Sequence, residues 1–144
     1  MSQDDINTSD SGLYVIAMSL NRPVKVRVGA LGMVMFGRGA YLYTGSARRY
    51  LKKRMERHRR RKKPLRWHID YFRKVSRWEF SVSFAGHSGE CELARLVEQA
   101  VDGAIAHSRF GSSDCRCPGH LIHTTMDIKI ISANLDILKR RGGF

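Results

Sequence analysis

The 144-residue sequence predicts a single α+β domain, with a small and mostly antiparallel sheet flanked by helices. Three observations predict this class. Short apolar segments separated by turn residues fill the first half of the chain, two longer segments with helical spacing follow, and one more alternating segment lies between them. A chain of this length can bury one hydrophobic core, and its 42% hydrophobic content is ordinary for a globular domain.

The first half of the chain is expected to form a meander of strands. Residues 12–20 are apolar on both alternating faces, as in an inner strand that is covered on both sides. Residues 24–28 alternate valine with basic residues, which is typical of a half-exposed antiparallel strand. Residues 33–36 and 41–44 complete the meander, and the two tyrosines of the last strand share one face. The polar residues 1–11 are expected to be a flexible lead-in.

A strand, a turn and a helix are expected to follow one another directly after residue 41. Gly45 allows a sharp exit from the strand, and Ser46 is a suitable N-cap for a helix that runs from Ala47 onward. Arg54 and His58 lie four residues apart, so their side chains share one face of that helix. Such a unit can bring phenol, guanidinium and imidazole groups together, which is a set suited to phosphate.

The second half of the chain alternates helices and strands. The expected elements are a short helix or tight turn at 66–72, a strand at 78–85, a second long helix at 90–106, and short strands at 120–125 and 128–132. Residues 127–144 are thus predicted to form a C-terminal strand and an open basic tail.

The charge balance predicts a polyanionic partner. The chain has 26 Lys and Arg against 13 Asp and Glu, a net charge of +13. Residues 48–63 hold eleven of these cations and the single acid Glu56, and such a helix lacks counterions unless a phosphate backbone supplies them. An ordinary solvated helix face is the alternative. The expected nucleic-acid contacts are Arg48, Arg49, Lys52, Lys53, Arg57, Arg59, Arg60, Arg61, Lys62, Lys63 and His68.

Membrane insertion and secretion are not expected. No segment approaches the roughly 18 apolar residues of a spanning helix, and residues 1–11 lack the apolar stretch of a signal peptide. Three cysteines, an odd number, favour a reducing compartment over a disulfide framework. We therefore expect a cytoplasmic protein. The sequence leaves its oligomeric state open.

Two tyrosine triplets carry a resemblance to a known family. Tyr14 ends the triplet Gly-Leu-Tyr and Tyr43 begins the triplet Tyr-Thr-Gly, with Arg54 and His58 on the following helix. Together these residues resemble the GIY-YIG nuclease superfamily. The resemblance covers roughly residues 12–124, and the implied nuclease-like domain is residues 12–126. The stretches that resemble a compact branch of it, found alone or beside an endonuclease III-like repair domain, are 41–47, 67–71, 90–94 and 110–121.

The chain departs from the superfamily pattern in two ways. Leu13 and Thr44 stand where the triplets usually have isoleucine, which is a conservative change in packing. The gap between the triplets is also longer than usual, because the residues 24–36 lie inside it.

The resemblance implies an endonuclease that uses Mg²⁺ or Mn²⁺ to hydrolyse phosphodiester bonds, in DNA more than in RNA, and in repair. It implies that Tyr14 helps to deprotonate the attacking water, that Tyr43 lines the same centre, and that Arg54 stabilises the transition-state charge. His58 assists proton transfer or holds phosphate. A partner repair domain is implied as well.

The metal ligand implied by the resemblance is a glutamate on the second long helix. Glu90 is the first choice, because it lies on the same stripe as the inward-facing Leu93 and Val97. Glu92 is the second choice, and Glu98 lies next to the core stripe. The alternative is that acidic residues early in a helix merely complement its dipole.

Two other clusters leave alternatives open. His68 and Asp70 are close enough in sequence to form a local structural pair, or they support the phosphate site. Buried thiols that pack a loop are the favoured interpretation of the cysteines, and structural zinc is the alternative; its candidate ligands are Cys91, Cys115, Cys117, His120 and His123. The rival functions are a basic nucleic-acid-binding module that does not cut, and a zinc-stabilised RNA-binding domain.

Overall fold

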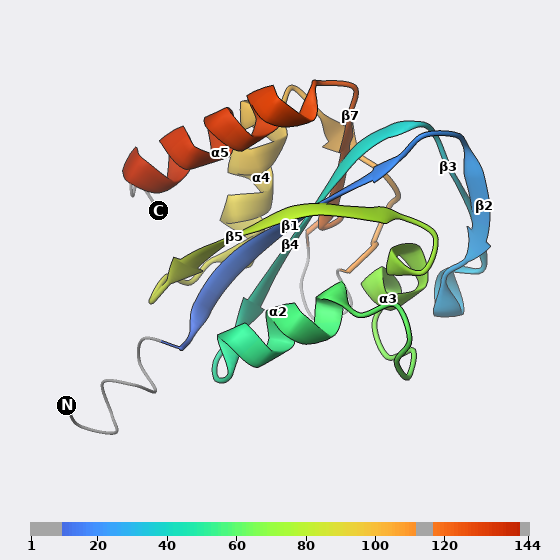
Figure 1. The fold of residues 1–144 in the computed structure, drawn as a ribbon, viewed down its shortest axis with the longest axis horizontal. Coiled ribbons are helices and arrows are strands. Elements are labelled where there is room, and N and C mark those ends of the chain that lie inside the picture. The colour runs from blue at the N-terminus through green and yellow to red at the C-terminus, as the bar shows by residue number, and fades with distance from the viewer. Residues whose placement is uncertain (1–9, 112–116, 142–144) are drawn as a thin grey trace.

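The computed structural model describes residues 10–111 and 117–141 and confirms the α+β class (Figure 1). Its antiparallel five-stranded sheet has the order β5-β1-β4-β7-β6, and β2 pairs with β3 in a separate hairpin. The strands are β1 (Gly12–Leu20), β2 (Val24–Arg27), β3 (Met33–Phe36), β4 (Gly39–Ala47), β5 (Arg77–Ala85), β6 (Ala104–Ile105) and β7 (Leu121–Thr124). The helices are η1 (Gly29–Leu31), α2 (Leu51–Arg59), α3 (His68–Arg73), α4 (Glu90–Ala100) and α5 (Ile128–Arg141).

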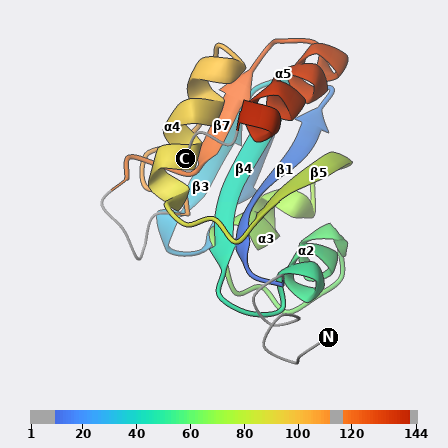
Figure 2. The same ribbon diagram turned by 90° about the vertical axis from the view of Figure 1, so that its left-hand side faces the viewer.

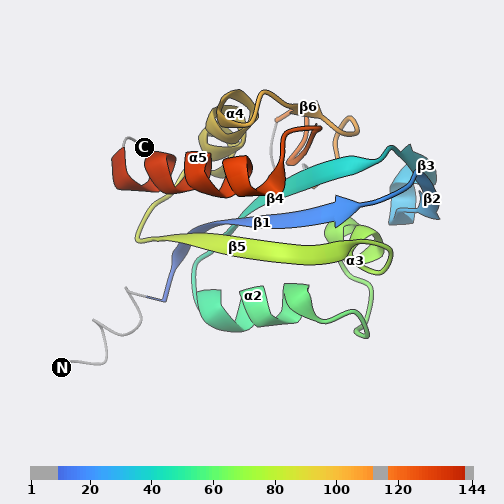
Figure 3. The ribbon, with the colours of Figure 1, turned by 45° about the horizontal axis from the view of Figure 1, so that its top comes forward.

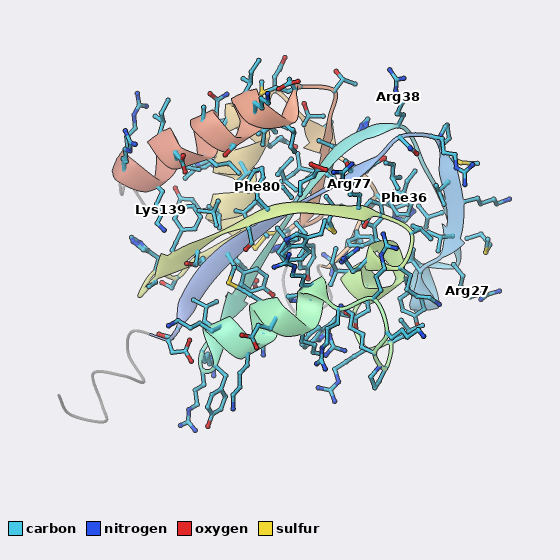
Figure 4. The ribbon with its side chains drawn as sticks, in the orientation of Figure 1. Arg27, Phe36, Arg38, Arg77, Phe80 and Lys139 are labelled. Carbon is cyan, nitrogen blue, oxygen red and sulfur yellow. A yellow bond between two sulfur atoms is a disulfide. The ribbon has the colours of Figure 1, made fainter. Side chains whose placement is uncertain are left out.

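The sheet separates two hydrophobic layers. Helices α4 and α5 cover one face, while α2 and α3 cover the other, where the β2–β3 hairpin also packs (Figures 2 and 3). In Figure 4, Phe80 lies in the layer beneath α5, and Phe36 lies in the layer that contains α3. The described helices include none that is both long enough and apolar enough to cross a membrane.

Strand β1 is the inner strand that the sequence predicts. It pairs antiparallel with β4 on one side and with β5 on the other. Leu13, Val15 and Ala17 pack beneath α4 and α5, whereas Tyr14 and Ile16 pack on the opposite layer. Because successive side chains of a strand point to opposite faces, an apolar run without alternation is what a strand covered on both sides requires.

Gly45 is inside β4 and does not form the expected exit from the strand. In the antiparallel register it lies directly opposite Tyr14, and a Cβ atom at position 45 would collide with the Tyr14 hydroxyl and ring. Position 45 therefore requires glycine, because a larger residue would not fit beside the Tyr14 side chain of the paired strand. The strand continues through Ala47.

Helix α2 begins at Leu51, so the expected start at Ala47 with a Ser46 cap is wrong. Tyr50 precedes it in the left-handed region, with φ 58°. The cap comes from the distant Asp10, whose carboxylate accepts the Lys52 N–H and whose carbonyl accepts the Leu51 N–H. The last part of the lead-in therefore has a fixed contact; residues 1–9 lie outside the described residues.

Two expectations for the second half of the chain are corrected. Helix α4 ends at Ala100, and β6 forms within the segment expected to be helical to residue 106. Residues 128–132, expected to be a strand, instead begin helix α5. Ile131 and Leu135 are fully buried and lie four residues apart, which is helical spacing. The short apolar run at 128–132 is by itself compatible with a strand or with a helix. The segment is packed on the sheet and is not an open tail.

Candidate active site

A polar pocket of about 190 Å³ opens beside the sheet on the face covered by α2 and α3. Residues from strands β1 and β4, helices α2, α3 and α4, the loop before α3 and the segment after β6 meet there. The lining residues are Tyr14, Tyr43, Gly45, Ser46, Arg54, Arg66, Trp67, His68, Glu90 and Gly111. Four of the five residues predicted to be catalytic line this pocket together, although they come from widely separated parts of the sequence.

The fifth, His58, lies behind Tyr14 and not in the pocket wall. Its Nε2 atom is 2.8 Å from the Tyr14 hydroxyl oxygen, and the side chain is 1% exposed. Burial, followed by the Lys63 ammonium, lowers the pKa of His58 from 6.5 to about 3. A neutral, buried imidazole cannot hold a phosphate from solvent. It can accept the Tyr14 hydroxyl proton as a hydrogen bond.

Burial favours the protonated form of both phenols. Burial raises the pKa of Tyr14 above its ordinary value of 10.0, and the Arg54 guanidinium only partly opposes that rise. Burial also raises the pKa of Tyr43, with Tyr14 and Glu90 as further causes. The ring centroids of the two tyrosines are 6.5 Å apart. Arg54 alone therefore does not generate a phenolate.

The Arg54 guanidinium is held at the pocket edge by two contacts. Its Nη1 atom donates a hydrogen bond to the Ser46 carbonyl at 2.7 Å, and its central carbon lies 5.1 Å from the centre of the Trp67 ring. A planar cation stacked in this way keeps its remaining N–H groups in a fixed direction. The site can therefore present a positioned positive charge to an anion.

Glu90 is the acidic side chain of the pocket. It is the first residue of α4, and its Oε2 atom accepts a hydrogen bond from the Ser46 hydroxyl at 3.3 Å. Glu92 is more than half exposed and pairs with Arg95 on the outside of the helix. The geometry therefore favours Glu90 over Glu92 as a ligand for a divalent cation entering the pocket.

His68 does not form the local pair with Asp70 that the sequence suggests. Its Nδ1 atom accepts the Gly111 N–H at 2.9 Å, which places the remaining ring proton on Nε2. Burial, with a smaller contribution from His107, lowers the pKa of His68 below 6.5. A neutral His68 in the pocket wall can donate one hydrogen bond.

Asp70 is instead the centre of a buried ion pair. Both of its oxygens accept hydrogen bonds from Arg57 at 3.0 Å, and the N–H groups of Arg66 and Trp67 also donate to it. Burial raises the pKa of Asp70, but these donors outweigh it and hold the pKa below 3.8. This carboxylate connects α2 to the start of α3, so it fixes one wall of the pocket.

The prediction that Arg57 and Lys63 contact nucleic acid is therefore corrected. The Lys63 ammonium lies 3.6 Å from Asp70 and donates to the Arg57 and His58 carbonyls, and its side chain is only 1% exposed. Burial lowers the pKa of Lys63 to about 8, although Asp70 opposes this shift. Both cations therefore bind groups within the fold, chiefly the Asp70 carboxylate.

The other predicted cations of the run stay at the surface. Those that are exposed are Arg48, Arg49, Lys52, Lys53, Arg59, Arg60, Arg61 and Lys62. Arg59 and Arg61 also contact the fold, through the Trp78 ring and the Ser76 carbonyl respectively. Sequence reasoning missed Arg66, which is exposed and lines the pocket; its only signal was its place just after the basic run.

The cysteines do not match the expectation of unpaired thiols. Cys91 and Cys117 are joined as a disulfide, and the Nε2 atom of His120 lies 3.7 Å from the Cys91 sulfur. His123 is directed away from this group and contacts the Arg38 carbonyl. Cys115, the remaining candidate zinc ligand, lies outside the described residues.

Comparison with known proteins gives a family but no individual relative. No curated protein and no solved structure matches the chain. One family matches residues 13–142, which is nearly the whole chain and includes every residue of the pocket wall. The chain therefore belongs to the family described as Domain of unknown function DUF123.

Proposed function

We propose that the protein is a metal-dependent endonuclease of GIY-YIG type that hydrolyses phosphodiester bonds in DNA, with a role in repair. One observation carries the proposal: Tyr14, Tyr43, Arg54 and Glu90 line one polar pocket, with His58 hydrogen-bonded behind it. A module that only binds nucleic acid has no need for a carboxylate and two buried phenols at the base of a basic surface.

The donor set of the pocket fits a divalent cation. Mg²⁺ is usually held by one or two carboxylates, while water and substrate phosphates fill its other positions. Glu90 supplies one carboxylate in a polar pocket large enough for several waters. When bound, Mg²⁺ or Mn²⁺ would act as a Lewis acid on the phosphoryl oxygens.

Tyr14 is assigned to the attacking water. His58 is neutral at physiological pH and accepts the Tyr14 hydroxyl proton, so a lone pair of the phenol oxygen is left for the pocket. That lone pair orients the water. As the water oxygen bonds to phosphorus and the P–O bond to the leaving nucleotide breaks, the phenol oxygen takes the water proton and passes its own proton to His58 Nε2, so Tyr14 stays neutral. Arg54 then stabilises the charge that develops on the phosphoryl group. Tyr43 lines the same centre, with its ring centroid 6.5 Å from that of Tyr14.

The surface beside the pocket is suited to a polyanion. Helix α2 lies on the same face of the sheet as the pocket, and its exposed cations extend from the pocket edge. Helix α5 also carries three exposed cations at its end, but it packs on the opposite face (Figure 3). Only the cations of the α2 side can contact a strand whose phosphate enters the pocket.

This arrangement predicts a face-specific salt dependence. Replacing Arg49, Lys52 and Lys53 by glutamine is expected to weaken DNA binding and to reduce the slope of log K against log salt by about 0.9 for each lost phosphate contact. Fluorescence anisotropy with a labelled duplex at several salt concentrations measures both quantities.

The matched control is a triple glutamine variant of the α5 cations. It removes the same charge, so an effect of net charge alone would be equal in the two variants. The residues replaced in the control are Lys139, Arg140 and Arg141. Equal slopes in the two variants would contradict a binding surface on α2.

A second prediction concerns the metal. Glu90→Gln is expected to abolish stimulation of cleavage by Mg²⁺ while leaving DNA binding in EDTA unchanged, because an amide is a poor ligand for this cation. Glu92→Gln is the control, since that side chain pairs with Arg95 outside the pocket. Cleavage is followed on gels over a Mg²⁺ titration. Full activity of Glu90→Gln would remove this assignment.

The overall test is cleavage of labelled linear, nicked, flapped and branched DNA, with matched RNA substrates, in Mg²⁺ or Mn²⁺. Metal-dependent cutting that the pocket variants lack supports the endonuclease. Binding without cutting on every substrate would indicate the non-catalytic module, and a preference for RNA without cutting would indicate the RNA-binding alternative. Stimulation by an endonuclease III-like protein would identify the partner domain.

A further inference from the structure

A second cluster of ligand-type side chains lies outside the pocket wall. The sulfur atoms of Cys91 and Cys117 and a ring nitrogen of His120 all lie within 4.8 Å of one another. Cys91 is in the first turn of α4, Cys117 follows the loop after β6, and His120 immediately precedes β7. The first turn of α4 and the segment before β7 thus converge on one point with the atoms that soft metal ions prefer.

The orientation of His120 is that of a metal ligand. Its Nδ1 atom faces the Thr44 carbonyl at 3.2 Å and the Thr44 hydroxyl at 3.1 Å, while Nε2 faces the Cys91 sulfur at 3.7 Å. Histidines that bind metals almost always donate their other ring N–H to a carbonyl or carboxylate, which fixes the tautomer. With the proton on Nδ1, the lone pair of Nε2 faces the Cys91 sulfur.

The cluster also has room for a fourth ligand. A cavity of about 280 Å³ adjoins both cysteines, and Glu98 and Arg95 line it further out. Zinc is usually tetrahedral, and sites with three protein ligands complete the shell with water. The neighbouring cavity can hold such a water beside the sulfur atoms.

We propose that Cys91, Cys117 and His120 bind one Zn²⁺ ion when the two cysteines are reduced. A thiol reductant opens the disulfide with two electrons and two protons, and zinc binding then displaces both thiol protons to solvent. The two thiolates and the neutral imidazole are ligands that select zinc over magnesium. This proposal is independent of the proposed nuclease function.

A bound ion would connect three parts of the fold. It would tie the first turn of α4 to the segment before β7, and through His120 to Thr44 in β4. Glu90 directly precedes Cys91, so the same ion would hold the start of α4 beside the pocket. We assign the zinc site a positioning role for this helix.

The test uses the full chain, reduced with a phosphine, loaded with zinc sulfate and desalted. One zinc per folded chain is expected by elemental analysis, and Cys91→Ser, Cys117→Ser and His120→Gln should each lose it. His123→Gln is the matched control, because that histidine lies in β7, three residues after His120, and contacts the Arg38 carbonyl instead. It should retain zinc.

A second measurement needs no variant. Zinc should protect Cys91 and Cys117 of the reduced wild-type chain from alkylation, as read by mass spectrometry of their peptides, and EDTA should remove the protection. Co²⁺ in place of zinc should give a thiolate charge-transfer band. A reduced chain that stays folded by circular dichroism and holds no zinc would overturn the proposal, as would zinc content that is unchanged in all three ligand variants.

Discussion

Tyr14→Phe is expected to lower metal-dependent DNA cleavage by about 10² to 10⁴-fold, the range of a lost acid–base group. The variant keeps the ring that packs against Gly45 and Tyr43 and removes only the hydroxyl that meets His58. Because one buried hydrogen bond is lost, the free energy of unfolding should fall by only about 1 kcal/mol. Tyr14→Phe is therefore expected to lose most of its cleavage activity while it keeps most of its stability.

Tyr50→Phe is the matched control for this experiment. Tyr50 lies at the start of α2, is 59% exposed and is absent from the pocket wall. Single-turnover cleavage with excess enzyme should show wild-type rates for Tyr50→Phe and a slow chemical step for Tyr14→Phe. Normal cleavage by Tyr14→Phe would remove Tyr14 from the chemistry, even if the other pocket variants were inactive.

Asp70→Ala is expected to be the most destabilising substitution of a charged residue. Its carboxylate is fully buried, and removal would leave the Arg57 guanidinium and the Lys63 ammonium without their partner. Breaking one side of a buried ion pair typically costs about 3–5 kcal/mol. Guanidinium chloride unfolding followed by tryptophan fluorescence measures the loss.

Glu92→Ala is the control for this prediction. Its ion pair with Arg95 is mostly exposed, so its loss should change the free energy of unfolding by about 0–1 kcal/mol. Equal effects of the two substitutions would show that the Asp70 network adds little to stability.

Asp70 also predicts how stability depends on pH. Its pKa is lower in the folded protein than the ordinary 3.8, so its contribution is complete above about pH 3.8 and is lost as the pH falls through the folded-state pKa. The wild type should therefore lose stability in this acidic range faster than Asp70→Ala. Acid titrations of the unfolding free energy in both proteins test this difference.

Strands β1 to β5 and β7 were predictable because their signals are local. Strand β6 and the helical state of residues 128–132 were not, and the expected meander is wrong because β1 pairs with β4 and not with β2. The apolar run of β1 and the valine alternation of β2 reflect side-chain directions that repeat every two residues. The register of β1 against β4 then brings Tyr14 and Tyr43 to one face. The sequence offered that shared face only as an expectation from the family resemblance, because the register between the strands decides it; Arg54 lies one turn inside the next helix.

The basic run at residues 48–63 shows that composition does not predict which cations stay at the surface. All eleven cations between residues 48 and 63 carry the same charge signal, yet Arg57 and Lys63 bind the buried Asp70. Which cation turns inward depends on where a distant acid is buried, and that is a property of packing. The start of α2 has a similar cause, because its cap is Asp10, more than forty residues earlier.

The sequence by itself determined the α+β class and the inner strand β1, and it indicated four of the pocket residues, Tyr14, Tyr43, Arg54 and Glu90, because strand periodicity and side-chain chemistry can be recognised one residue at a time. Only the tertiary structure decided that Glu90 and not Glu92 faces the pocket, that His58 lies behind Tyr14, and that Cys91 meets His120. These outcomes depend on how helices rotate and pack on the sheet, and long-range contacts fix that rotation.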